Sequence, residues 1–97
     1  MIFVYQFNKD LGEFEEFESH QNVPLFELLD SEKILLFVDS HEGKIWVWQG
    51  KNTTTRMKFV SAQVAPHIRD KHDLMFTINS VDENEETIAF KLLVGLV

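Results

Sequence analysis

Residues Ile34–Val38 are five consecutive apolar side chains, with no polar residue on either face of an extended chain. A strand that is covered on one face alternates apolar and polar residues, whereas a strand covered on both faces is apolar throughout. The run therefore predicts a central strand of a sheet that carries a packed layer on each side. Turn residues follow at 39–43, and a second β-rich run at Lys44–Trp48 predicts a neighbouring strand. Within it, Trp46 and Trp48 share one face and are interpreted as core aromatics rather than ligand-stacking ones.

Turn residues and hydrophobic periodicity divide the rest of the chain into short elements. Strands gather ahead of one long helix, an order that predicts a mixed-sheet α/β (α+β) domain with helices covering the sheet. The predicted elements are, in order, strands at Ile2–Phe7 and Glu13–Glu18, an irregular segment with at most one helical turn at Val23–Asp30, a long helix at Thr53–Asp70, a strand at Leu74–Ile78, an acidic turn at Asp82–Glu86 and a short helix at Thr87–Leu93.

The long helix carries one apolar stripe and one irregular residue. The stripe repeats at steps of three and four residues and is expected to face the core. Pro66 lies inside the helix, where it removes one intrahelical hydrogen bond and predicts a kink or early fraying. The stripe consists of Met57, Val60 or Ser61, Val64 and Ile68.

Phe59 lies beside this stripe, on a flank that also carries Arg56, Gln63 and His67. An aromatic residue among long polar side chains is a common anchor in protein interfaces. A wide core stripe would include Phe59 equally well. The sequence favours neither interpretation over the other.

Composition excludes several classes of function. A formal net charge of −7, without a cluster of Lys and Arg, argues against a nucleic-acid partner. No apolar run approaches the ~20 residues of a membrane span, and the absence of cysteine fits a reducing, cytoplasmic compartment. No phosphate-binding glycine loop, nucleophile elbow or zinc-protease motif occurs. The 97 residues are therefore expected to form one domain, spanning 1–97, that binds a partner and is not an enzyme.

The segments Ile34–Asp39 and Lys44–Lys51, followed by the long helix, resemble the repeat unit of the gelsolin, villin and severin family. That family shows an apolar strand ending in Asp, a turn, a strand finishing in Trp-x-Gly, and then the long helix. The resemblance spans nearly the whole chain. Further matching segments are Val23–Leu25 before the central strand, residues 62–64 and 68–70 in the long helix, and Asp82–Gly95 with its acidic turn, short helix and closing Gly.

This resemblance implies a gelsolin-like domain, a five-stranded mixed sheet between one long and one short helix. It also implies binding to actin, often under calcium control. In the family's actin-binding first domain, the long helix lies in a cleft between two actin subdomains. Val64 would then belong to both the core stripe and the actin contact, and either role is compatible with the sequence. The actin-binding positions carried over to this chain are Arg56, Phe59, Gln63, Val64, His67 and Asp70.

The resemblance extends to calcium with one clear departure. The family's intrinsic site uses a Gly-Asp pair entering the central strand and a Glu in the long helix, but this chain has Lys33-Ile34 and Met57 there. Calcium requires oxygen ligands, so that site is expected to be lost. A second family site is shared with actin, and it implies calcium ligands at Asp70 and at Asp82 or Glu83.

Two hypotheses for function follow. The first is an actin-binding module that sequesters monomers or weakly caps filament ends, with calcium as a modulator. Efficient severing is not expected, because it requires two linked binding surfaces. The alternative is a gelsolin-fold scaffold or interaction domain that does not bind actin.

Overall fold

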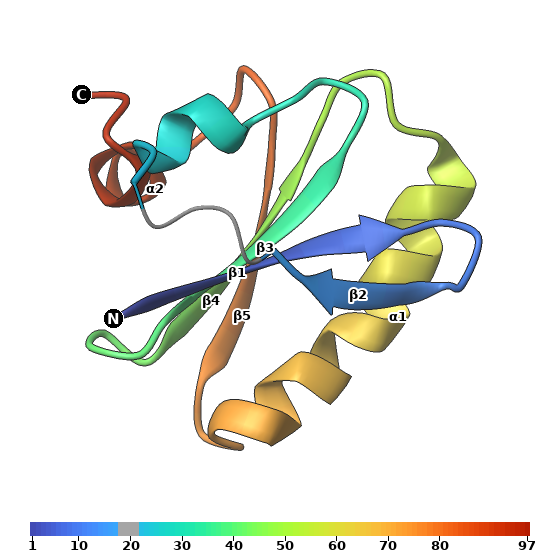
Figure 1. Ribbon diagram of the computed structural model, residues 1–97, viewed down its shortest axis with the longest axis horizontal. Coiled ribbons are helices and arrows are strands. Elements are labelled where there is room, and N and C mark those ends of the chain that lie inside the picture. Colours follow the sequence, from blue (N-terminus) through green and yellow to red (C-terminus); the bar gives the residue numbers. More distant parts are fainter. Residues whose placement is uncertain (18–21) are drawn as a thin grey trace.

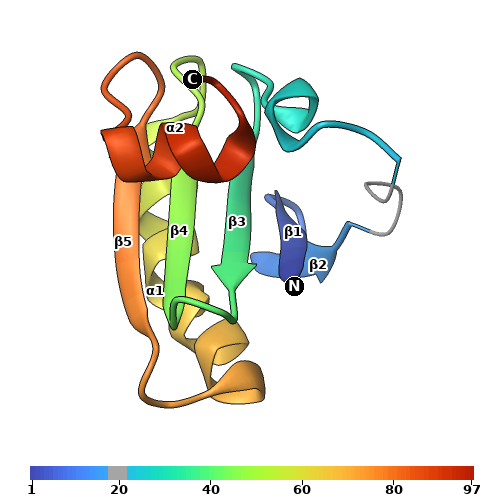
Figure 2. The same ribbon diagram turned by 90° about the vertical axis from the view of Figure 1, so that its left-hand side faces the viewer.

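The computed structural model describes residues 1–17 and 22–97, so that Glu18, predicted to end a strand, lies outside the described residues. The elements are β1 (Ile2–Asn8), β2 (Glu13–Glu16), the 3-10 helix η1 (Leu25–Leu28), β3 (Ile34–Asp39), β4 (Lys44–Gln49), α1 (Thr55–His72), β5 (Thr77–Asp82) and α2 (Ile88–Val94). The strands form one five-stranded sheet in the order β2-β1-β3-β4-β5. Helix α1 covers one face, and α2 with η1 covers the other (Figures 1 and 2). The predicted mixed sheet between a long and a short helix is confirmed.

Strand β3 occupies the centre of the sheet, as its apolar run predicts. It pairs antiparallel with β1 on one side and with β4 on the other, and β4 pairs parallel with β5. Ile34, Leu36 and Val38 belong to the core beneath α1. Leu35 and Phe37 belong to the core beneath α2. The continuous apolar run is therefore the signature of a strand buried on both faces.

Helix α1 begins after Thr54, whose hydroxyl accepts a hydrogen bond from the Met57 amide at 3.1 Å. The predicted stripe faces the sheet, with Ser61 and Ile68 buried in it. The early fraying expected at Pro66 is wrong, because the helix continues to His72. Pro66 costs one backbone hydrogen bond, but buried residues on both sides of it hold the helix against the sheet.

Four aromatic rings fill the core beneath α2. The Phe90 ring lies edge-on to Phe37 and Trp46, with centroids 5.6 and 5.8 Å away. Trp48 is almost fully buried, and its indole nitrogen donates to the Glu86 carboxylate at 2.9 Å. The interpretation of both tryptophans as core residues is confirmed.

The strand predicted at Leu74–Ile78 lies further along the chain, at Thr77–Asp82. Asp73 explains the shift. Its carboxylate accepts from the Met75 amide at 2.8 Å and its carbonyl oxygen from the Phe76 amide at 3.0 Å, so these residues form a turn. An apolar run resembles a strand, but here Leu74 and Met75 project into solvent and only Phe76 packs inward.

Gly50 ends β4 where the chain passes close to the loop before β3. A Cβ atom at this position would lie 2.4 Å from the Ser31 carbonyl oxygen, so no other residue fits without moving the backbone. The Thr53 hydroxyl also donates to the Gly50 carbonyl oxygen at 2.7 Å. The glycine of the Trp-x-Gly sequence is thus a packing requirement.

Replacing Trp48 by alanine should lower the free energy of unfolding by about 3–5 kcal/mol, because it leaves a cavity under α2. Trp48→Phe retains a packed ring and should cost distinctly less. Urea unfolding followed by circular dichroism measures both. Equal stability of Trp48→Ala and the unmodified protein would contradict the packing described here.

Candidate protein interface

The face of α1 that points away from the sheet carries an exposed stripe, which we call the outer α1 stripe: Arg56, Phe59, Gln63, His67 and Asp70. Steps of three and four residues place these side chains on one side of a helix. Phe59 is 64% exposed, which decides between its two interpretations, since it is not part of the core. All five residues belong to the predicted contact set.

Val64, the sixth residue of that set, has a different environment. It is partly buried and packs against the core between α1 and the sheet. It therefore lies at the border of the outer α1 stripe, with part of its surface committed to the fold. The core role of Val64 is therefore observed, and its contact with actin stays a prediction.

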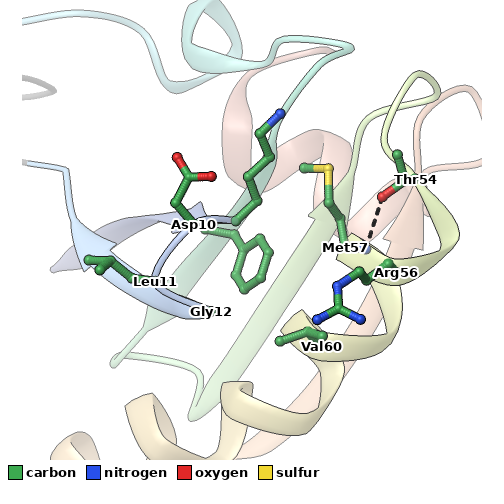
Figure 3. Close-up of a pocket in the computed structure, with 9 residues that line it drawn as sticks. Asp10, Leu11, Gly12, Thr54, Arg56, Met57 and Val60 are labelled. Carbon is green, nitrogen blue, oxygen red and sulfur yellow. Dashed lines mark hydrogen bonds between the residues drawn. The ribbon is translucent and has the colours of Figure 1, made fainter.

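A cleft of about 400 Å³ adjoins the first turns of α1 (Figure 3). The β1–β2 turn forms one wall with Asp10, Leu11 and Gly12, and Arg56 and Val60 form the other. Leu11 is largely exposed there. No sequence pattern predicts this cleft, because Leu11 and Arg56 lie far apart in sequence and only strand pairing brings the turn beside the helix.

The C-terminal turn of α1 is tied to the sheet by His72. Its Nε2 is hydrogen-bonded to the Tyr5 hydroxyl at 2.9 Å, and the Phe3 ring lies 4.7 Å away. Burial, with a smaller contribution from the nearby Glu16 charge, raises the pKa of Tyr5, so the phenol stays protonated. This contact joins the C-terminal end of α1 to β1.

The structure does not bring the predicted calcium ligands together. Asp82 ends β5 opposite Gln49, whereas Asp70 lies near the C-terminal end of α1, close to where β5 begins. A strand of this length separates the two ends by about 17 Å, while oxygens bound to one calcium ion lie within about 2.6 Å of it. Arg69 also lies beside Asp70, with its Nε 3.6 Å from the carboxylate.

Glu83 has a structural role instead. Its carboxylate accepts from the Lys51 amide and the Ser31 hydroxyl, both at 2.9 Å. The Lys51 amide, helped by Ser31 and the Lys51 charge, lowers the pKa of Glu83. Lys33 and Met57, which stand at positions of the family's intrinsic calcium site, line one shallow hollow, and the loss of that site stays a prediction. Within residues 1–17 and 22–97, no group of three or more acidic or histidine side chains is arranged to hold a metal ion.

The sequence matches no protein-family model and no curated protein, and its likeness to known proteins lies among solved structures. Thorarchaeota ProGel, crystallised with rabbit actin, superposes with a TM-score of 0.79 at 24% identity, over 98% of this chain and 100% of that one. Thorarchaeota 2DGel3, also crystallised with rabbit actin, gives a TM-score of 0.65 at 25% identity. That match covers 92% of this chain and 43% of the 2DGel3 chain. The chain has a gelsolin-type fold.

All five side chains of the outer α1 stripe are exposed in the gelsolin-type fold. None of the helices in the described part of the chain is both long and apolar enough to cross a bilayer. The stripe and the adjoining cleft combine an exposed aromatic ring with charges of both signs. Aromatic and arginine side chains such as Phe59 and Arg56 are enriched in surfaces that bind another protein.

Glu83→Gln should lower the stability of the gelsolin-type fold at neutral pH. The folded-state pKa of Glu83 is lowered, so its contribution is present above the unfolded-state pKa and is lost as the pH falls through the folded-state value. The difference between variant and unmodified protein should shrink accordingly on acidification. Thermal melts from pH 7 to pH 3 test this, with the exposed Glu85→Gln as the matched control. A difference that does not change with pH would contradict the assignment.

Proposed function

We propose that this protein is an actin-binding module that uses the outer α1 stripe as its contact surface. The observation that carries the proposal is the exposed ring of Phe59 on an uncovered helix face. Both structural neighbours, ProGel and 2DGel3, were crystallised with rabbit actin. Together they support actin as the partner, and a cytoplasmic location stays a prediction that goes with it.

The chemistry of the stripe supports a protein contact. Phe59 supplies a large apolar ring, and its neighbours Arg56, Gln63 and His67 supply hydrogen-bonding groups. Interface hot spots combine a desolvated aromatic anchor with a polar surround. An 18-residue helix is about 27 Å long, enough to follow an extended groove on a partner.

The proposed activity is monomer sequestration or weak capping of filament ends. The fold presents one long helix, and thus one surface of this kind, in the described chain. Severing requires one subunit to be held while its neighbour is displaced, and two linked surfaces achieve this through effective concentration. Efficient severing is therefore not part of the proposal.

The three predicted calcium ligands do not lie together at one site in the described structure. Asp82 ends β5, Asp70 lies near the end of α1 that leads into β5, and Glu83 is already hydrogen-bonded. A calcium ion shared with actin stays a prediction of the resemblance, with Asp70 as the one ligand from this set that lies on α1. We assign no calcium-dependent step to these residues.

Isothermal calorimetry of calcium into the isolated protein should show no binding in the micromolar range, because the separated carboxylates do not supply the six to eight oxygens that calcium requires. Asp70→Asn serves as the matched variant. Micromolar binding that Asp70→Asn abolishes would show that other oxygens complete a site there.

The double variant Phe59→Ala, Gln63→Ala should bind monomeric actin at least about tenfold more weakly, since it removes the central anchor of the stripe. Folding should be retained, because Phe59 is largely exposed. Leu92→Ala is the matched control, an exposed apolar residue on the α2 side of the sheet. Fluorescence titration of labelled actin measures affinity, and unchanged affinity of the double variant would remove α1 from the interface.

A gelsolin-fold interaction domain without actin affinity is the alternative function. The outer surface of α2 favours it, because Ile88 and Leu92 are exposed one helical turn apart, near exposed Leu96 and Val97. Absence of actin binding by the unmodified protein in the titration above would favour this alternative.

A further inference from the structure

We propose that Leu74 and Met75 form a second apolar anchor of the same actin interface, at the C-terminal end of α1. The inference rests on the proposed function and adds a site that lies outside the long helix. We call these two residues the α1–β5 tip. They are 69% and 86% exposed, although they belong to the residue types that are usually buried.

The backbone of the tip is held in place from both sides. The Asp73 amide donates to the Arg69 carbonyl oxygen at 2.8 Å, and the Asp73 carboxylate accepts from the Met75 amide at 2.8 Å. On the other side, the Thr77 amide donates to the Gly43 carbonyl oxygen at 3.2 Å. Phe76 packs into the core beneath α1. The turn is therefore preorganised, which reduces the entropy lost when it binds a partner.

The side chains of the tip contribute little to the fold. The buried clusters on the two faces of the sheet include Phe76 and Ile78 but neither Leu74 nor Met75. Polar residues at these two positions would serve the turn equally well, because its hydrogen bonds use Asp73 and backbone groups. An apolar pair held out into water by a rigid turn is a feature of binding surfaces rather than of folding.

The tip continues the outer α1 stripe. Asp70 belongs to the stripe, and Leu74 follows it only four residues later, just past the end of α1 at His72. Phe59 lies 13 residues before His72, a helical distance of about 20 Å. One partner surface along α1 would therefore meet an aromatic anchor in the N-terminal half of the helix and an aliphatic anchor just beyond its end.

The charge around the tip favours a protein partner over a lipid surface. Asp70 and Asp73 beside the tip balance Arg69 and Lys71, and the chain as a whole has a net charge of −7, so an anionic membrane would not attract it. Two side chains are also too small a surface for a stable pair of copies, which buries about 800 Å² on each. The occupant that fits is an apolar recess on the actin subunit that α1 contacts, and the flexible Met75 side chain adapts to its shape.

The test compares three variants of the whole chain by titration of labelled monomeric actin. Leu74→Ser, Met75→Ser should bind at least about tenfold more weakly than the unmodified protein. Ile88→Ser, Leu92→Ser, which changes two apolar residues on α2 that are 69% and 65% exposed, should retain the original affinity. Met75→Leu, which keeps an apolar side chain, should lie within about threefold of the unmodified protein. Thermal melts should show that all three remain folded.

Each other outcome overturns the inference, and the pattern shows which proposal fails. If the double variant Phe59→Ala, Gln63→Ala binds more weakly and the tip variant does not, the tip lies outside an interface that α1 still forms. If the unmodified protein does not bind actin, both proposals fail. Equal losses in the tip variant and the α2 variant would indicate a nonspecific apolar effect. Loss of sedimentation with phosphatidylserine vesicles, or of self-association, at unchanged actin affinity would assign the tip to a lipid surface or to a second copy.

Discussion

Every side chain of β3 from Ile34 to Val38 is removed from water, and each face of the strand requires its own covering layer. Helix α1 supplies one layer and α2 with η1 the other. The inward face of each helix packs against the sheet, so only its outward face is available for contacts with other molecules. The position of Phe59 on the surface is thus a consequence of what Ser61, Ala65 and Ile68 do beneath it.

The order of elements followed from sequence because periodicity and turn residues are local signals. Thr87 before Ile88 marks the start of α2, and Pro24 excludes a central strand at Val23–Asp30, where the structure has only the short helix η1. The position of β5 was wrong because Leu74–Phe76 looks like the start of a strand. The side chain of Asp73 instead accepts a hydrogen bond from the Met75 amide and holds these residues in a turn. Strand β5 is a polar edge strand, so only its pairing with β4 identifies it.

The candidate site was predictable where it lies on one element and not where it joins several. Arg56, Phe59, Gln63, His67 and Asp70 share a helix, so spacing alone places them on one stripe. The neighbourhood of Leu11 and Val60 depends on how β1 pairs with β2 and on how α1 crosses the sheet. The grouping of Asp70 with Asp82 and Glu83 depended likewise on topology. Strand β5 lies between Asp70 and Asp82 in the chain, and its length separates Asp70 from both Asp82 and Glu83.

The crowding at Gly50 bears on how proteins of this fold are recognised. Trp48 fills the core, and Gly50 leaves room for the Ser31 carbonyl oxygen. Packing within the fold therefore requires both residues of the Trp-x-Gly sequence. Neither belongs to the outer α1 stripe. A relative could therefore exchange every residue that touches a partner and still retain this signature. A sequence search with the Trp-x-Gly signature therefore identifies proteins that share the fold. The residues that determine the binding partner lie at other positions, which can diverge independently.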